Sequence, residues 1–323
     1  MTLLLDAAVF DDLEGQVDIV PYQFRFEPLF EAMVALGDDI ASSDVRFVTG
    51  VNCLHRLLLF LSGKRNKKFR IDVEIIGKNV FLSRWEKDRA TLARATFSSG
   101  NGKGFEQACT AKHNAERGIS TFHRIVSYQL GGLSFLVQHE VDACGGNCAK
   151  VAMEHDTVPE PESREEYPWS LNLEQRMKTD GPGTLRVTKS GARHTSSCLV
   201  EIKSRAHNNT DLDDVLGQLW LSRSHNLLLG RHVKGEFPSD SVKEENMTVQ
   251  IEQWQRDNDQ AIAGLIKLLR KVQEILVDAR DVEGHSRYAI VHKGGIDKTQ
   301  LQLYRRQGGQ DMIPTHLWSL INS

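Results

Sequence analysis

Two segments far apart in this 323-residue chain each place a pair of charged side chains beside an apolar run. Leu133 to Val137 leads into Glu140-Val-Asp142, and Cys198-Leu-Val200 leads into Glu201-Ile-Lys203. Side chains two residues apart on a strand point to the same face of a sheet. We therefore expect each pair to project together from a largely buried strand. Ionised groups in such surroundings are unfavourable unless they are paired or bind a metal ion.

Local patterns predict strands and helices that alternate along the chain. Phe69 to Ile76 alternates apolar and polar residues and precedes Val80-Phe-Leu82, which predicts a β-hairpin. Residues 120–143 predict two strands separated by Gly131-Gly132. Further predictions are helices from about Pro28, over 54–61, over 85–98, from Phe105 to about Arg117, after Thr210 or Asp211 and over about 249–277 (one helix or two end to end), and strands at 183–189, 197–204, 227–229, 288–291 and 301–304.

These elements predict the α/β class, with central mixed β-sheets flanked by helices in a single domain over residues 1–323. Residues 154–167 are acidic and contain prolines, so we expect an exposed surface insertion there. Residues 245–280 form the expected C-terminal helical segment.

The composition limits the class of protein. Hydrophobic residues make up 40% of the chain and charged residues 26%, as in ordinary globular proteins. Five cysteines without framework spacing indicate reduced thiols. The N-terminus lacks the features of a signal peptide, and no apolar run approaches the roughly 20 residues that span a bilayer. We expect an intracellular protein of the nucleus or cytoplasm, with no membrane partner.

The net charge of −3 gives no overall positive field, although a local groove can still be basic. One candidate basic patch contains Arg65, Lys67, Lys68, Arg70 and Arg84, and a second contains Lys203, Arg205, Arg223 and Arg231. A solvated charged face is the alternative interpretation of each patch.

Three carboxylates and one lysine predict a divalent-metal site that cleaves phosphoesters. Hydrolysis by two Mg²⁺ ions needs several oxygen ligands at one point, and a nearby lysine offsets negative charge on the scissile phosphate. A strand with Asp followed by a strand with Glu-x-Lys is the minimal pattern of the PD-(D/E)xK nuclease-like core. The alternative is a same-face ion pair between Glu201 and Lys203, because Glu-x-Lys also occurs by chance.

Four motifs occur in an order that resembles the DXO family of RNA 5′-end decapping enzymes. They are a degenerate Gly102-Lys-Gly-Phe-Glu106, then Glu140-Val-Asp142, Glu201-Ile-Lys203, and Gln218-Leu-Trp-Leu-Ser on a helix that leads to a strand. Upstream, Val45 to Gly50 and Gly77 to Leu82 resemble the N-terminal part of that family. The resemblance covers about residues 40–240.

The resemblance implies a role for each matching residue. Glu106, Asp142 and Glu201 are expected to bind the metal directly, with the backbone carbonyl of Ile202 as a further ligand. Glu140 is expected to serve the second ion or its waters. Lys203 and Gln218 are expected to position the nucleophilic water or the scissile phosphate. The implied cofactor is two Mg²⁺ or Mn²⁺ ions.

Members of that family remove incomplete or unusual RNA 5′ ends (triphosphates, unmethylated caps, NAD caps), and some then degrade the RNA 5′→3′. The resemblance therefore implies a metal-dependent hydrolase of single-stranded RNA 5′ ends, of the decapping and mRNA quality-control type. A 5′→3′ exoribonuclease is a candidate partner. A PD-(D/E)xK deoxyribonuclease and a catalytically inactive relative that binds RNA or a partner are the alternatives.

The sequence also departs from the family pattern. The family usually carries an arginine just after its Phe-Val-Thr-like strand, where it meets the RNA 5′ end, but residues 47–52 contain none. Arg70 and Arg84 are candidates to replace it, and Lys103, Arg205 and Arg231 are further candidate phosphate contacts. The stretch from Asp142 to Glu201 is longer than in the family, and the stretch from Glu201 to Gln218 is shorter, which predicts different loops around the RNA. His139 is expected to face outward from its strand.

Overall fold

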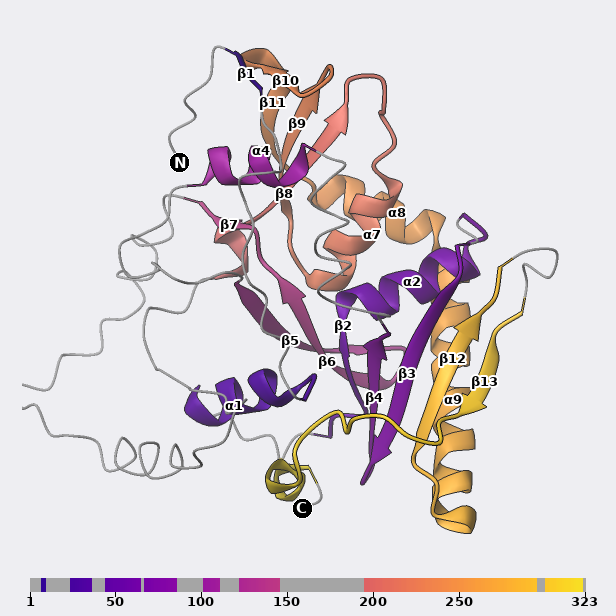
Figure 1. Cartoon of the computed structure of the whole chain (residues 1–323). Coiled ribbons are helices and arrows are strands. Elements are labelled where there is room, and N and C mark those ends of the chain that lie inside the picture. The colour runs from indigo at the N-terminus through magenta and orange to yellow at the C-terminus, as the bar shows by residue number, and fades with distance from the viewer. Residues whose placement is uncertain are drawn as a thin grey trace, which may run out of the picture.

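A computed structural model describes residues 7–9, 24–36, 44–64, 67–85, 101–110, 122–145, 195–294 and 300–321 of the chain. Helices flank two mixed β-sheets (Figure 1), which confirms the fold class expected from the sequence. A separate two-stranded pairing joins β1 (Ala7–Val9) to β10 (Glu236–Pro238).

The larger sheet has seven strands in the order β13-β12-β3-β4-β2-β6-β5. Their bounds are β2 (Phe47–Gly50), β3 (Phe69–Ile76), β4 (Asn79–Arg84), β5 (His123–Leu130), β6 (Leu133–Glu140), β12 (Arg287–His292) and β13 (Gln302–Arg305). Strand β2 runs parallel to both β4 and β6, and the remaining pairs are antiparallel. The ends of β2, β4, β6 and β12 and the start of β3 therefore lie along one edge of this sheet.

The smaller sheet has four strands in the order β11-β9-β8-β7. Their bounds are β7 (Ala143–Cys144), β8 (Leu199–Ala206), β9 (Asn226–His232) and β11 (Val242–Asn246). Strands β8 and β9 are parallel, and the two outer pairs are antiparallel.

Six α-helices are described: α1 (Glu27–Leu36), α2 (Val51–Leu61), α4 (Gly102–Cys109), α7 (Asp213–Ser222), α8 (Thr248–Asp257) and α9 (Asp259–Glu283). Short 3₁₀ turns cover Ser196–Cys198, Ser239–Ser241 and Thr315–Leu320. No helix in the described part of the chain is long and apolar enough to cross a bilayer.

Alternating side chains cover both faces of the larger sheet. Phe47 and Phe135 belong to one apolar cluster with helices α2, α7, α8 and α9, and this cluster extends to Leu227 of the smaller sheet. The neighbouring residues Val48 and Leu136 belong to a second cluster with α1 and the turn at Thr315–Leu320. Since successive strand residues point to opposite faces, one apolar run serves both clusters. Helix α7 lies between the smaller sheet and α2 (Figure 1).

Helix α4 packs directly on the smaller sheet. The ring of Phe105 is fully buried and stacks on Phe237, with ring centroids 4.4 Å apart. A Cβ atom at Gly230 of β9 would lie 2.2 Å from the Phe105 ring, so only glycine allows this close approach. This contact fixes the helix that carries Glu106.

Most of the described elements follow the sequence pattern. The hairpin formed by β3 and β4 and the strands β5, β6, β8, β9, β12 and β13 are confirmed. The predicted C-terminal helical segment is two helices, which meet at Asn258, whose side chain donates to the carbonyl of Trp254 at 2.8 Å. Asp211 accepts a hydrogen bond from the backbone N–H of Asp213, the first residue of α7, at 2.9 Å. The expected insertion at 154–167, the strand at 183–189 and residues 86–98 of a predicted helix lie outside the described residues.

Candidate active site

Strand β8 presents Glu201 and Lys203 on the face opposite its apolar contacts with α4. Val200 and Ile202 pack in the cluster that contains Phe105, while Glu201 points to the other side and is only 4% exposed. The ammonium of Lys203 donates a hydrogen bond to Oε1 of Glu201. The prediction that these two side chains share one face is therefore confirmed.

Asp142 lies two residues beyond the end of β6 and reaches across to β8. Its Oδ2 accepts a hydrogen bond from the backbone N–H of Ile202 at 2.8 Å, and Lys203 Nζ lies 3.5 Å from the same oxygen. The chain thus brings the end of a strand of the larger sheet to a strand of the smaller sheet. The contact made by Ile202 in the structure involves its N–H group, whereas the family resemblance implies a role for its carbonyl oxygen.

Gln218 approaches the same carboxylate from helix α7. Its Nε2 donates to Oε1 of Glu201 at 2.7 Å, so this oxygen accepts from both Gln218 and Lys203. Four residues from the end of β6, from β8 and from α7 therefore form one hydrogen-bonded and ion-paired group.

Burial and like charges raise the pKa of two carboxyl groups in this region. Burial is the largest cause for Glu106, and the charges of Asp142 and Glu140 add to it, so its pKa rises to about 7 despite the lowering effect of Lys103 and Lys203. Burial also raises the pKa of Glu201 to about 7, and Asp142 and Glu140 act in the same direction, while Lys203 lowers it. Raised carboxyl pKa values caused by burial and neighbouring carboxylates are typical of functional sites.

Lys203 remains protonated in this environment. Burial alone would lower its pKa, but the charges of Glu201 and Asp142 together raise it above the usual value for lysine. The ammonium group therefore supplies the counter-charge to both carboxylates.

Glu140 and His139 occupy opposite faces of β6. Glu140 is exposed, and its negative charge raises the pKa of both Glu106 and Glu201. His139 is only 7% exposed, so the expectation that it faces outward is wrong. It alternates in phase with Phe135 and Val137, which face the core. Burial lowers the pKa of His139 to about 4, and its ring is therefore neutral near pH 7.

The chemistry of this group of side chains fits a hard divalent cation. Carboxylate oxygens from Glu106, Glu140, Asp142 and Glu201 are the donors that Mg²⁺ and Mn²⁺ prefer. Within the described residues, however, no three His, Cys, Asp or Glu side chains already converge as a metal-binding group. The ammonium of Lys203 lies between Asp142 and Glu201 instead. The donors fit the ion, and side-chain movement is needed for them to bind it.

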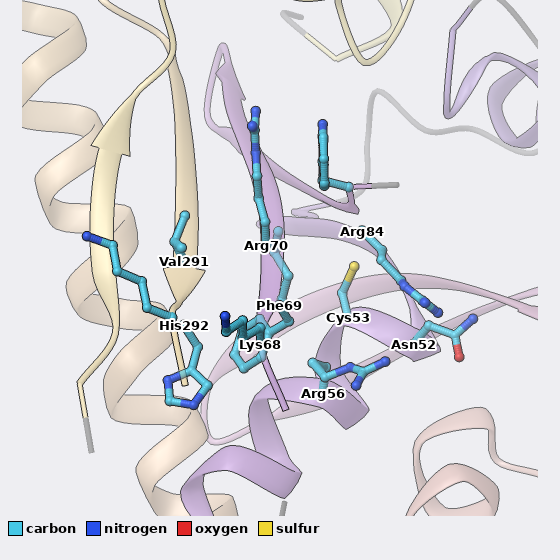
Figure 2. A pocket seen from close by; sticks show the side chains of 12 residues that line it. Asn52, Cys53, Arg56, Lys68, Phe69, Arg70, Arg84, Val291 and His292 are labelled. Carbon is cyan, nitrogen blue, oxygen red and sulfur yellow. The ribbon is translucent and has the colours of Figure 1, made fainter. Parts of the chain in front are cut away.

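The predicted basic residues lie in different places. The charge of Lys103 lowers the pKa of Glu106, so Lys103 lies close to the carboxylates. Arg205 pairs with Asp214 at 3.3 Å, and Arg231 donates to the carbonyl of Asn209 at 2.6 Å. Arg70 and Arg84 instead line a separate cavity at the edge of the larger sheet (Figure 2).

Two further cations line that cavity and were not singled out in the sequence. Arg56 is the one Lys or Arg in the otherwise mostly apolar α2 segment, and this isolation was an available signal. Lys293 follows β12, which pairs with β3 from a distant part of the chain. No local pattern could have placed it in the same cavity as Arg70.

The sequence matches, over residues 9–321, the profile of a family described as Domain of unknown function (DUF8563). The chain belongs to this family. This match covers more of the chain than the DXO resemblance, which covers about residues 40–240. No curated protein matches the sequence.

Three solved structures resemble this chain. Scheffersomyces stipitis Rai1 in complex with (3′-NADP)+ and calcium ion has a TM-score of 0.58 and 14% identity, with coverage of 92% of this chain and 79% of that chain. Candida albicans Rai1 in complex with pU5-Mn2+ has a TM-score of 0.55 and 10% identity, with coverage of 97% and 86%. S. pombe Rai1 has a TM-score of 0.52 and 13% identity, with coverage of 86% and 76%. At these identities the likeness establishes a shared fold, and it confirms the DXO-family resemblance at that level.

Proposed function

We propose that this protein is a divalent-metal-dependent hydrolase that acts on the 5′ ends of RNA. The observation that carries the proposal is the meeting of Asp142, Glu201, Lys203 and Gln218 from separate elements of the chain. A buried group of carboxylates with one lysine is unfavourable as a purely structural device, because replacing buried ion pairs with apolar residues is often neutral or stabilising. The raised pKa of Glu201 in this group, and of Glu106 near it, favours chemistry over packing.

The solved Rai1 structures support the choice of substrate and cofactor class. One of them holds pU5 with Mn2+, and another holds (3′-NADP)+ with calcium. We extend these ligand classes to the present chain as part of the proposal. The site of action we propose is the nucleus or cytoplasm, with a 5′→3′ exoribonuclease as a candidate partner.

In the proposed mechanism, Glu106, Asp142 and Glu201 would hold Mg²⁺ or Mn²⁺, with Glu140 serving the second ion or its waters. Such ions polarise the phosphate and lower the pKa of a bound water. The backbone N–H of Ile202 fixes Oδ2 of Asp142, and Nε2 of Gln218 fixes Oε1 of Glu201. The protonated Nζ of Lys203 offsets negative charge on the scissile phosphate. The contacts of Ile202 and Gln218 orient the two carboxylates, and Lys203 would move from between them when the ion binds.

The test is incubation of the purified protein with triphosphate-, cap- and NAD-ended RNAs in Mg²⁺ or Mn²⁺, with mass analysis of the products. We expect a metal-dependent product released from at least one 5′ end. Glu201→Gln and Asp142→Asn should lower turnover by about a thousandfold, since loss of a metal ligand removes several kcal/mol of transition-state stabilisation. Both substitutions preserve side-chain shape, so a thermal melt of each variant checks the fold.

Two outcomes would favour the alternatives. Cleavage of a matched DNA but not of any RNA would indicate a deoxyribonuclease. Tight RNA binding without turnover in either metal would indicate a catalytically inactive relative.

A further inference from the structure

A positively charged cavity of about 580 Å³ opens at the edge of the larger sheet (Figure 2). It is formed by the start of α2, the start of β3, the end of β4 and the end of β12. Five lysines and arginines line it, and none of its described lining residues is Asp or Glu. They are Arg56, Lys68, Arg70, Arg84 and Lys293.

This concentration of charge is unusual in a chain whose net charge is −3. Asp72 accepts a hydrogen bond from Nε of Arg70 at 2.7 Å and so offsets one of the positive charges. Like charges gathered in one cavity repel each other, and a bound anion relieves that repulsion.

Two of the five cations lie close to the start of helix α2. Arg84 and Arg56 extend from the end of β4 and from α2 toward Asn52, the second residue of that helix (Figure 2). The residue before the helix is Gly50, and no side chain caps the first turn. The N-terminal end of a helix dipole therefore adds to the field of the two guanidinium groups.

A buried histidine, His292, forms part of the wall of the cavity. His292 is only 1% exposed, and its Nδ1 lies 3.2 Å from the carbonyl of Gln300. Its Nε2 is buried and has no hydrogen-bond partner among the described residues. The ring of His292 packs against Phe60 and Phe69, with centroids 4.9 Å and 5.5 Å away, and so closes one side of the cavity.

An exposed aromatic ring adds a stacking surface beside the cations. Trp85 follows β4 and is 42% exposed, and the guanidinium of Arg70 lies 5.0 Å from its ring centroid. Positively charged grooves combined with aromatic rings are typical of sites that bind single-stranded nucleic acids.

The cavity lies on the same sheet edge as the carboxylates. Strand β2 pairs Thr49 with Leu82 of β4 and Gly50 with Gln138 of β6, both in parallel. Arg84 and Glu140 each follow their paired residue by two positions. Their backbones are thus two strands apart, about 10 Å at the usual strand spacing.

We propose that this cavity binds phosphate groups of a single-stranded nucleic acid. This inference rests on the proposed function in one respect: a strand bound in the cavity would lie next to the phosphoester on which the carboxylates act. The cations neutralise phosphate, and Trp85 offers a face for a base. The shared chemistry is a phosphate, carried either at the strand's 5′ terminus or within its backbone.

The test measures binding in the absence of divalent metal, by fluorescence anisotropy of oligouridine labelled at its 3′ end. Lys68→Ala/Lys293→Ala removes two exposed cations without touching the core, and a further variant adds Arg56→Ala. The matched control is Arg256→Ala/Lys267→Ala, which removes two exposed cations from α8 and α9. We expect a rise in Kd of about tenfold for the double cavity variant, a larger rise for the triple variant, and a change within about twofold for the control.

Three probes distinguish the sources of phosphate. If only the 5′-phosphorylated strand binds more weakly to the cavity variants, the cavity holds the terminus. If the 5′-hydroxyl strand is weakened equally, it holds internal phosphates. Inorganic triphosphate that binds through the cavity while neither strand does would overturn the nucleic-acid assignment. So would cavity variants that bind both strands as the native chain does, or a control variant that loses as much affinity.

Binding and hydrolysis are measured separately, so the two proposals fail independently. The metal-free assay reports binding of the strand alone, and the product assay in Mg²⁺ or Mn²⁺ reports hydrolysis. If no RNA end is hydrolysed but the cavity variants still lose affinity, the cavity assignment stands without the proposed reaction. If hydrolysis occurs and the cavity variants bind and turn over normally, only the cavity assignment falls.

Discussion

The side-chain amide of Gln218 donates a hydrogen bond to Oε1 of Glu201 at 2.7 Å, which ties helix α7 to strand β8. Lys203 donates to the same oxygen. Because Glu201 is only 4% exposed, water contributes little to its solvation, and these two donors largely set its orientation and charge.

Gln218→Ala removes one of these donors and should lower turnover by roughly 10–100-fold, the usual effect of losing a partner that orients a metal ligand. Turnover at saturating RNA and Mn²⁺ measures it. Gln253→Ala is the matched control, since Gln253 is an exposed glutamine whose amide donates to Asp257 within α8. Equal activity of the Gln218→Ala and Gln253→Ala proteins would contradict an orienting role for Gln218.

Lys203→Met should separate metal binding from turnover. The ammonium of Lys203 now lies where it offsets the charges of Asp142 and Glu201, so its removal leaves a more negative site. Above pH 7, the pKa of Glu201 in the native chain, we expect Mn²⁺ affinity to rise by about tenfold, measured by calorimetry. Turnover should still fall, because no cation then faces the scissile phosphate.

Lys271→Met provides the comparison for that experiment. Lys271 is an exposed lysine of α9 that pairs with Glu274 at 3.0 Å. It should leave both Mn²⁺ affinity and turnover unchanged. Weaker Mn²⁺ binding by the Lys203→Met protein would show that Lys203 supports the metal site rather than competing with the ion.

Local sequence patterns were sufficient for most strands of the larger sheet and for the pair of residues on β8. The alternation in residues 69–76 predicted β3, and the two-residue spacing of Glu201 and Lys203 predicted their shared face. The same rule would have placed His139 in the core, because it is in phase with Phe135 and Val137. Strand β11 was not predicted, since Val242–Asn246 is a mostly charged, exposed edge strand without an apolar signal.

Long-range relationships could not be obtained from local patterns. Only the resemblance to a known family connected Glu106 with the other carboxylates, because α4 is brought to the site by the contact of Phe105 with Gly230. The cavity also depends on the pairing of β12 with β3, which places Val291 opposite Arg70. Pairings of this kind depend on the packing of the whole sheet.

The raised carboxyl pKa values make a contribution to stability that falls as pH rises, whereas the lowered pKa of His139 makes one that rises up to about pH 6.5. The pKa values of Glu106 and Glu201 rise from the ordinary 4.5 to about 7 in the folded chain. Between these values the folded state binds protons that the unfolded state has released, so the contribution of these two carboxyls to the free energy of unfolding decreases with pH. This contribution is fully present below about pH 4.5 and is lost by about pH 7.

Urea unfolding from about pH 4.5 to about pH 8 measures this effect, with an upper limit of about 1.4 kcal/mol per pH unit for each proton. Solvent screening makes the share of the partly exposed Glu106 smaller. Glu201→Gln removes one titrating group and should flatten the curve. Mn²⁺ should raise stability most near the upper end of the range, since it binds the ionised carboxylates. A curve for the Glu201→Gln protein as steep as that of the native chain would contradict the assignment of this titration to Glu201.

Gly230→Ala should disturb the site from a distance by displacing helix α4. The added Cβ would lie 2.2 Å from the fully buried ring of Phe105. Because the ring is enclosed on all sides, it cannot move away without displacing its neighbours. We expect a loss of about 1–3 kcal/mol in the free energy of unfolding, as for other overpacked cores, and reduced turnover because Glu106 follows Phe105. Gly264→Ala in α9 is the control: its nearest neighbour would be Leu61 at 3.6 Å, an ordinary contact, so higher helix propensity should stabilise the chain by up to about 1 kcal/mol. Normal stability and turnover of the Gly230→Ala protein would show that α4 does not depend on this contact for its position.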